Sequence, residues 1–232
     1  MMWSARTKIG WSLVLAGAVL MALFAARYYT FDPANYFERQ RAVYENQTLP
    51  LMLHISGMLF ALLAGPFQFR PGLRRRHRAV HRALGKAYVA GAIVGAVGGL
   101  YMAQFSASGP PSDLGFALLA IGVLVTTTLG VVRIRQGMVQ SHGEWMIRSY
   151  ALIFAAITLR LYLPFLEKAF GEHDGYAIVA WACWLPNLAF AEWLIRSRQA
   201  AKSVRSGSRS PRSTARSTST QHMPRDSART LA

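Results

Sequence analysis

Six apolar runs, each close to the length that crosses a bilayer, constrain the fold of this chain more than any other feature. They occupy residues 9–26, 49–69, 85–105, 114–132, 145–170 and 176–195. A helix of about 20 apolar residues spans the hydrocarbon core of a membrane. Charged residues make up 16% of the chain, whereas soluble domains carry roughly 25%. We therefore predict an all-α polytopic membrane helix bundle with six transmembrane helices, contained in residues 1–196.

A basic block between the second and third runs sets the expected topology. The stretch from Leu73 to Tyr88 contains no acidic residue, and residues 70–86 hold seven Lys or Arg. Basic residues gather on the cytoplasmic side of membrane proteins, and six spans place both termini on one side. We predict an N-in/C-in protein of the bacterial cytoplasmic (inner) membrane, in which this block forms an inner-face loop that leads into a helix.

The C-terminal tail, residues 197–232, is basic and rich in Ser, Thr and Arg. A segment with so few large apolar residues cannot bury enough surface to fold, so we predict a disordered tail. Its Ser-Arg repeats also occur in RNA-binding arms. Behind six spans, however, attraction to anionic lipids is the favoured interpretation. The expected partners are therefore the lipid bilayer and its anionic lipids, and not nucleic acid.

Small residues recur every four positions in two consecutive runs. They are Gly57, Ala61 and Gly65 in the second run, and Gly91, Gly95 and Gly99 in the third. Small residues at this spacing let two helix backbones approach closely within a membrane. We therefore expect the second and third spans to pack together. The same stripes are alternatively available for a homo-oligomer.

The connection between the first two runs, residues 28–48, combines aromatic and polar residues. Asp32-Pro33 is a typical helix start, with Asp as the N-cap and Pro in the first turn. Tyr36, Phe37 and Tyr44 then fall roughly on one face. We predict a short amphipathic helix on the outer surface of the membrane.

Polar residues inside the apolar runs are candidates for a ligand site, because ionisable groups within a membrane are costly and usually functional. His54 lies near the start of the second run, and Arg160 lies in the fifth. Since these spans run in opposite directions, both side chains are expected in the outer half of the bilayer. Asn187 follows Pro186 and is expected to bond a carbonyl that the proline leaves free. We interpret His54 and Arg160 as one polar pocket; the alternative is that both are buried groups that neighbours satisfy or that extend outward to the interface.

The inner face holds a second set of candidates. His81 and His142 begin the third and fifth spans, where the positive helix end favours a neutral imidazole, the form that ligates haem iron. Arg148 and Glu192 also lie at this end, and Glu192 is expected either to extend its side chain to the interface or to pair with an arginine such as Arg148. Three interpretations stay open for the histidines: ligands of haem b, hydrogen-bonded cap residues, and part of an anion or lipid-headgroup site.

The sequence excludes several kinds of chemistry. Cys183 is the single cysteine, so an intramolecular disulfide and a cysteine-based metal site are excluded. The chain contains no HExxH motif, no phosphate-binding loop and no nucleophile triad. Hydrolase or kinase chemistry of the soluble type therefore has no support, and we expect a protein that is not an enzyme of these classes.

Several motifs in a fixed order indicate a family. They are His54-Ile55-Ser56-Gly57 with Gly65-Pro66-Phe67-Gln68, HRALGKAY ending at Tyr88, the segment from His142 to Leu152, Leu159-Arg160-Leu161, and the segment from Trp184 to Trp193. Over roughly Leu49 to Arg196 they resemble the predicted bacterial membrane proteins grouped as domain of unknown function 2306. The resemblance implies a multi-span inner-membrane protein and no established activity, cofactor or substrate. The histidines at helix ends are also similar to those of dihaem b-type cytochromes and ferric reductases, although the four-histidine core of those proteins is missing here.

Three functional hypotheses follow from these patterns. The first is a membrane protein that binds or moves a small ligand through the pocket around His54 and Arg160. The second is a b-type haem redox protein that uses His81 and His142. The third is a structural or assembly partner that oligomerises through its glycine stripes.

Overall fold

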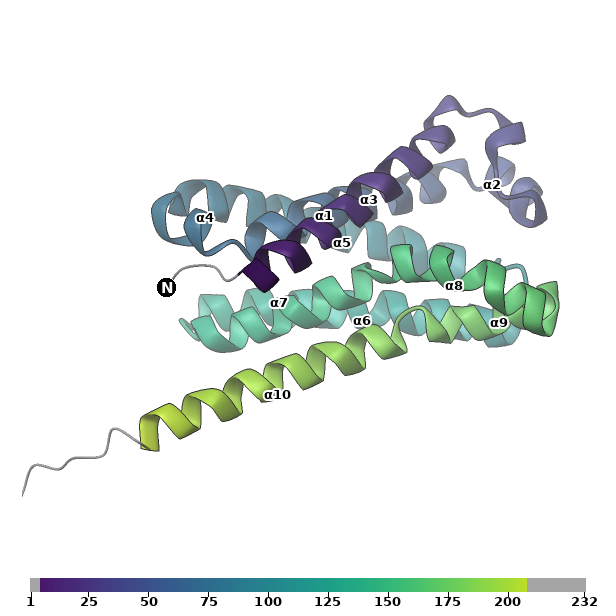
Figure 1. Ribbon diagram of the computed structural model, residues 1–232. Helices are drawn as coiled ribbons and strands as arrows, with labels where there is room; N and C mark the ends of the chain where they lie inside the picture. Colours follow the sequence, from purple (N-terminus) through teal and green to yellow (C-terminus); the bar gives the residue numbers. More distant parts are fainter. Residues whose placement is uncertain (1–4, 208–232) are drawn as a thin grey trace, which may run out of the picture. The chain divides into compact units, whose positions relative to one another are not determined.

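The computed structural model describes residues 5–207, and every regular element in this range is a helix (Figure 1). The elements are α1 (Ala5–Ala26), the 3-10 helices η1 (Arg27–Thr30), η2 (Pro33–Asn35) and η3 (Glu38–Gln40), then α2 (Arg41–Asn46), α3 (Thr48–Gln68), α4 (Pro71–Arg76), α5 (Arg78–Ala103), α6 (Pro110–Arg135), α7 (Val139–Ile153), α8 (Ala155–Phe170), α9 (Glu172–Ala182) and α10 (Leu185–Gly207).

Within residues 5–207, six helical stretches are long and apolar enough to cross a membrane, which confirms the predicted class. They are Lys8–Thr30, Thr48–Gln68, Arg78–Ala103, Pro110–Arg135, Val139–Phe170 and Glu172–Ser203. The fifth consists of α7 and α8, which meet at Phe154, and the sixth consists of α9 and α10. Pro186 accounts for the break before α10, because proline lacks the N–H that a continuous helix would need. The orientation of the termini stays a prediction.

The helices extend beyond the apolar runs, and this corrects the predicted inner-face loop. The basic block is largely helical, since α4 covers its first part and α5 already begins at Arg78. Likewise, α10 continues to Gly207, so residues 197–207 of the predicted tail are helical. Arg and Lys are good helix formers with long side chains that reach the interface, so a helix need not end with its apolar run. The rest of the predicted tail, residues 208–232, lies outside the described residues.

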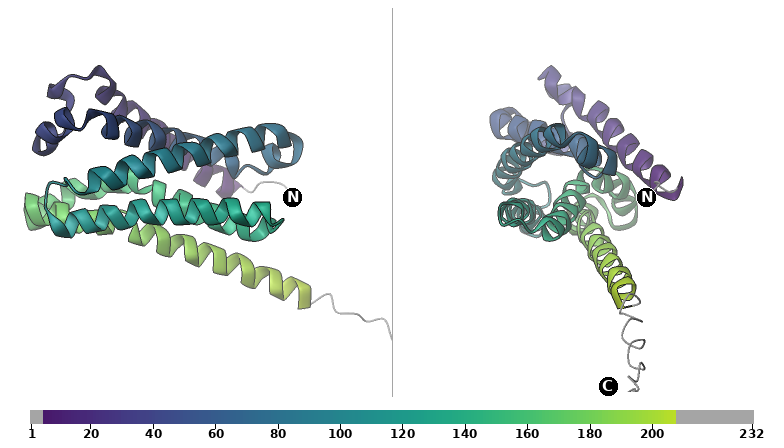
Figure 2. Two further views of the ribbon diagram at one scale, coloured as in Figure 1. Left: turned by 180° about the vertical axis from the view of Figure 1, so that it is seen from behind. Right: turned by 90° about the vertical axis from the view of Figure 1, so that its left-hand side faces the viewer.

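The most extensive helix contact joins α3 and α5, as the glycine stripes predict. A Cβ atom added to Gly57 would lie 2.5 Å from the carbonyl oxygen of Gly91, and one added to Gly95 would lie 2.6 Å from the backbone nitrogen of Met58. These two helices therefore touch through their backbones. In the end-on view of Figure 2, α1 lies at the outside of the bundle, where it contacts α3 and α8.

A short chain of buried hydroxyls joins three further helices. Tyr88 of α5 shares a hydrogen bond of 2.9 Å with Ser149 of α7, and Ser149 shares one of 2.8 Å with Thr127 of α6. All three side chains are buried. Because each hydroxyl satisfies its neighbour, the core holds this polar group without an unpaired atom, and the three helices are fixed in register.

The connection after α1 differs from the amphipathic helix predicted within residues 28–48. Residues 27–46 form η1, η2, η3 and α2, four short helices that fold over one end of the bundle (Figure 1). The predicted helix start is right, since the Asp32 side chain accepts a hydrogen bond of 2.9 Å from the Ala34 backbone nitrogen. The helix that begins there is short, because Tyr36 is extended and ends η2. Before it, Phe31 adopts a left-handed conformation with φ of 56° at the end of η1.

Aromatic contacts and one ion pair hold this cap in place. The rings of Tyr28 and Tyr36 are stacked with centroids 5.7 Å apart, and the Tyr44 ring meets both edge-on. Arg39 pairs with Glu167 of α8 and donates to the Glu172 carbonyl oxygen at 2.9 Å. We call this the capped end of the bundle. The opposite end, where α4 and the start of α5 lie, is the basic end.

Candidate functional site

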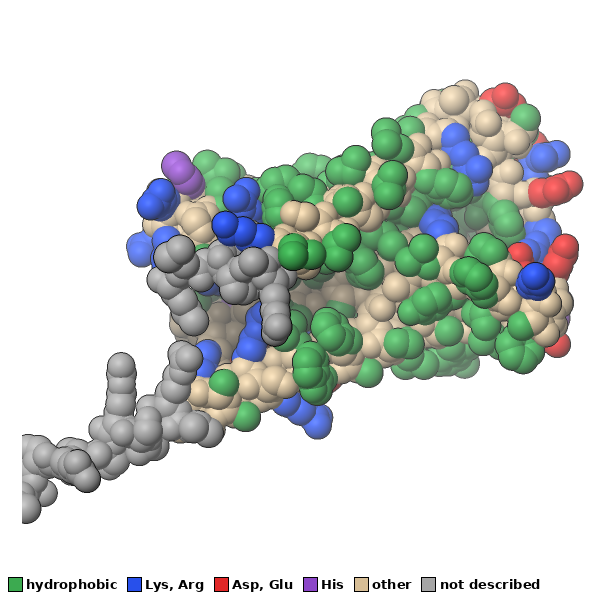
Figure 3. All heavy atoms as spheres, viewed as in Figure 1, with side chains coloured by type: hydrophobic (Ala, Val, Ile, Leu, Met, Phe, Trp, Pro, Cys, Tyr) green, Lys and Arg blue, Asp and Glu red, His purple; other side chains and the backbone are tan. Residues whose placement is uncertain are grey.

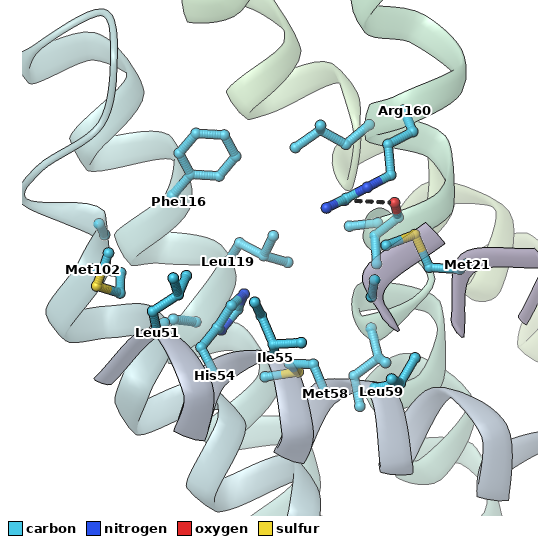
Figure 4. Close-up of a pocket in the computed structure, with 18 of the residues that line it drawn as sticks. Met21, Leu51, His54, Ile55, Met58, Leu59, Met102, Phe116, Leu119 and Arg160 are labelled. Carbon is cyan, nitrogen blue, oxygen red and sulfur yellow. Dashed lines mark hydrogen bonds between the residues drawn. The ribbon is translucent and has the colours of Figure 1, made fainter. Parts of the chain in front are cut away.

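A cavity of about 290 Å³ lies within the half of the bundle nearer to the capped end. Side chains from α1, α3, α5, α6, α7, α8, α9 and the cap line it, and most of them are apolar. Figure 4 shows aliphatic and thioether side chains around the space, with the His54 ring and the Arg160 guanidinium on different walls. In Figure 3 the surface is hollowed between α1 and α8, and a Lys or Arg side chain lies within the hollow.

The His54 side chain packs against α5 where glycines leave space for the imidazole ring. Its Nδ1 lies 2.9 Å from the Gly95 carbonyl oxygen, and because a carbonyl can only accept, Nδ1 is the donor. The ring packs on Gly99, where an added Cβ would lie 2.5 Å from Nδ1. A neutral ring held in this way keeps an unprotonated Nε2, and no described residue bonds that atom. The ring can therefore offer one acceptor to a molecule in the cavity.

Arg160 lies in α8 on another wall of the same cavity. Its Nη1 donates to the Ala156 carbonyl oxygen at 2.9 Å, which is the dashed line in Figure 4. Its Cζ lies 5.4 Å from the centroid of the Phe24 ring. Among residues 5–207, no carboxylate lies within ion-pair distance of it. The structure thus brings His54 and Arg160 to one cavity, as the antiparallel spans suggest.

The cap and α9 add polar side chains to the lining that the sequence patterns do not predict. Arg27, Tyr28 and Tyr44 of the cap line the cavity, and so does Tyr176 of α9. Burial raises the pKa of the Tyr44 phenol, and the neighbouring Tyr176 and Tyr28 rings raise it further. The Tyr44 hydroxyl therefore stays protonated at neutral pH, and it donates to Gln40. A signal for Tyr28 and Tyr44 does exist in the sequence, since tyrosines are dense between the first two apolar runs.

Asn187 lies outside the cavity that His54 and Arg160 line. Its Nδ2 donates to the Cys183 carbonyl oxygen at 2.9 Å and to Thr158 Oγ1 at 3.1 Å. The Asn187 side chain does not line the cavity, so it is not brought together with His54 and Arg160. Its bond to a carbonyl one turn earlier, next to Pro186, agrees with the expected role of satisfying the break between α9 and α10.

At the basic end, His81 and His142 lie close enough to interact electrostatically. His142 Nδ1 donates to the Gly130 carbonyl oxygen at 2.8 Å, an arrangement that fixes the ring and leaves Nε2 available. His81 Nδ1 is buried and has no hydrogen-bond partner within the described chain. Neither ring lines the cavity described above. No group of three or more His, Cys, Asp and Glu in residues 5–207 is arranged to hold a metal ion.

Arg148 and Glu192 form the expected ion pair between α7 and α10. Arg148 Nη2 donates to Glu192 Oε2 at 3.1 Å, and Nε donates to the other carboxylate oxygen. The arginine also lies over the Trp145 ring, with Cζ 4.6 Å from the centroid. Two parallel hydrogen bonds are the geometry that arginine makes with a carboxylate. The pair therefore balances two charges inside the candidate spans.

Comparison with known proteins supports the family. A family model described as "Predicted membrane protein (DUF2306)" matches residues 51–195. No curated protein and no solved structure matches the chain. The matched region contains His54, Arg160, His81 and His142. Helix α1 and the cap, which includes Arg27 and Tyr28, precede it.

Proposed function

We propose that this chain, which belongs to the DUF2306 family of predicted membrane proteins, binds or moves a small ligand through the cavity around His54 and Arg160. The observation that carries the proposal is the cavity itself. Protein interiors are close-packed, and a space of about 290 Å³ with a few convergent polar groups is the usual form of a small-molecule site. The surrounding apolar walls favour a ligand that is itself largely apolar.

The expected surroundings of the protein follow from its charge pattern. We place the basic end on the cytoplasmic side of the bacterial inner membrane, where Lys and Arg gather and where anionic lipids attract them. The glycine stripes give little support to a homo-oligomer, because Gly57, Gly91 and Gly95 are already in contact within one chain. A distinct surface would have to form any interface between copies.

Filling the cavity tests the proposed function. Decanol serves as the probe, added to purified protein in phosphatidylcholine nanodiscs while the midpoint of thermal unfolding is measured. Ala96 is fully buried and lines the cavity, so Ala96→Phe occupies space that the probe would use. A ligand at about 100 times its Kd adds roughly 2.7 kcal/mol, which corresponds to a rise of several degrees. We expect that rise in the wild type and its loss in Ala96→Phe.

The matched control is the same substitution on the lipid-facing side of α5. Ala90 is exposed, so Ala90→Phe changes the same helix without entering the cavity, and decanol is expected to stabilise it as it does the wild type. Ala103→Phe, at a second buried position of the lining, replaces Ala96→Phe if that variant does not fold. Equal responses of the cavity-filling variants and Ala90→Phe would contradict the proposal.

Haem binding by His81 and His142 is the alternative function. It is favoured by the buried, unpartnered Nδ1 of His81 and by the proximity of His142. A porphyrin also needs a flat space between its two ligands, and neither histidine lines the cavity. The haem hypothesis therefore ranks second to ligand binding.

The absorption spectrum of protein purified in detergent tests the haem alternative. Under our first proposal, the protein carries no Soret band. A Soret band that is lost in both His81→Ala and His142→Ala would establish haem ligation. His77→Ala is the matched control, because His77 is exposed at the same end of the bundle and immediately precedes the same helix.

A further inference from the structure

Three arginines near the cavity, Arg27, Arg39 and Arg160, differ in whether a carboxylate balances their charge. Arg39 is paired with Glu167. Arg27 and Arg160 both line the cavity, and within residues 5–207 neither is at ion-pair distance from a carboxylate. Their Cζ atoms lie 4.1 and 5.4 Å from the centroid of the same Phe24 ring. Two positive charges therefore converge on one part of the cavity wall.

The hydroxyls of Tyr28 and Tyr176 add hydrogen-bond donors beside the two arginines. Tyr28 is 6% exposed and Tyr176 is 7% exposed, and both rings line the cavity near Arg160. No hydrogen bond joins either hydroxyl to another described residue, and neither hydroxyl oxygen is fully buried, so both can bond a molecule in the cavity. The Nε of Arg27 is buried and has no partner among the described residues. The site therefore has a surplus of donors as well as of positive charge.

No described residue of the lining supplies a negative charge, since the lining contains neither Asp nor Glu. Charges inside a membrane protein are costly unless they are paired. An anion would satisfy both guanidinium groups and the tyrosine hydroxyls, and hydrogen bonds between charged groups are the strong ones. A cationic ligand would be repelled, and a neutral ligand would leave both charges unpaired.

The rest of the cavity is suited to an apolar chain. Met21, Met58 and Met102 lie on three different helices around the space (Figure 4). Thioether side chains are flexible and adapt to irregular apolar shapes. The hollow between α1 and α8 in Figure 3 lies on the side that faces lipid if these helices span the membrane. The charged part and the apolar part of the site thus adjoin each other.

From these contacts we infer that the ligand is a single-chain amphiphile with an anionic group, either a carboxylate or a phosphate. The anionic group binds between Arg27 and Arg160 beneath the tyrosines of the cap. The chain extends among the methionine and leucine side chains of α1, α3 and α5. This assignment rests on the proposed function, since it names the class of ligand for the same cavity.

Three probes with the same alkyl chain test the assignment. Decanoate, decyl phosphate and decanol are titrated into the protein in phosphatidylcholine nanodiscs, and the apparent Kd is taken from the shift of the unfolding midpoint. We expect at least one of the two anions to bind about tenfold more tightly than decanol. Arg160→Gln is expected to remove this advantage while leaving decanol binding intact, and Arg160→Lys, which keeps the charge, is expected to retain part of it.

Arg41→Gln is the matched control, because Arg41 is exposed on α2 and lies outside the cavity. It removes the same charge from the capped end and is expected to behave as the wild type, which separates a specific site from general attraction of anions. If Arg160→Gln does not fold, Arg27→Gln replaces it. The assignment is overturned if neither anion binds more tightly than decanol, or if the advantage survives in Arg160→Gln or in the Arg27→Gln variant that replaces it. Failure of the proposed function is distinct, since decanol would then give no response that Ala96→Phe removes.

Discussion

Gly57→Leu is expected to destabilise the bundle strongly, because it forces two helix backbones apart. An added Cβ at this position would lie 2.5 Å from both the carbonyl oxygen of Gly91 and the backbone nitrogen of Gly95. These are backbone atoms of α5, so no side-chain rotation relieves the clash and the two helices must separate. Overpacking of a core costs about 1–3 kcal/mol, and occasionally more. We expect a loss of at least about 3 kcal/mol, or roughly 10 °C in the unfolding midpoint.

The measurement is thermal unfolding of the purified protein in nanodiscs, with size-exclusion chromatography to detect protein that does not fold. Gly10→Leu is the matched control, because Gly10 lies in the apolar helix α1 and an added Cβ there meets no atom within 4 Å. Both variants add the same apolar side chain to a candidate span. A Gly57→Leu protein as stable as Gly10→Leu would contradict the backbone contact between α3 and α5.

The spans and the pairing of α3 with α5 are the parts of the fold that sequence alone predicts. An apolar run of about 20 residues is a local property, and it determines the element without any knowledge of its neighbours. The spacing of Gly57, Gly91 and Gly95 also carries tertiary information, because a backbone contact requires small residues at those positions. The ends of the helices are less predictable, since basic residues such as Arg78 prolong a helix beyond the apolar run.

The candidate site is only partly predictable from the same patterns. His54 and Arg160 are conspicuous because they interrupt apolar runs, and the direction of each span places them at a similar depth. Arg27 follows the first run immediately, where a basic residue is ordinarily a flanking charge at the interface. Its position in the cavity depends on how α1 lies against α3 and α8, which no local pattern specifies. The same is true of Tyr176, whose place depends on the turn between α8 and α9.

The cap shows why the prediction for residues 28–47 is wrong. Aromatic residues at helical spacing favour an amphipathic helix on the membrane surface. In the structure, the aromatic side chains pack against one another instead. The rings of Tyr28, Tyr36 and Tyr44 contact each other, and Phe37 stacks on Tyr176. Tyr28 and Tyr36 are thus buried instead of facing lipid.

Glu192→Gln is the second change with a large expected effect. Arg148 is 18% exposed at its side chain and lies within a candidate span, so removal of the carboxylate leaves a largely buried cation without its counter-charge. Breaking a buried pair from one side costs about 3–5 kcal/mol, and partial exposure of Glu192 places our expectation at about 3 kcal/mol in the free energy of unfolding. Urea or thermal unfolding in nanodiscs measures it.

Two further variants decide whether the charge or the packing is responsible. Glu45→Gln removes a carboxylate that is exposed on α2 and is expected to change stability by less than about 0.5 kcal/mol. The double variant Arg148→Met with Glu192→Leu removes both charges and keeps apolar volume between α7 and α10. Since apolar replacement of a whole buried pair is often neutral or stabilising, the double variant should be more stable than Glu192→Gln. A double variant less stable than the single one would show that the helices depend on the ion pair itself and on its two parallel hydrogen bonds.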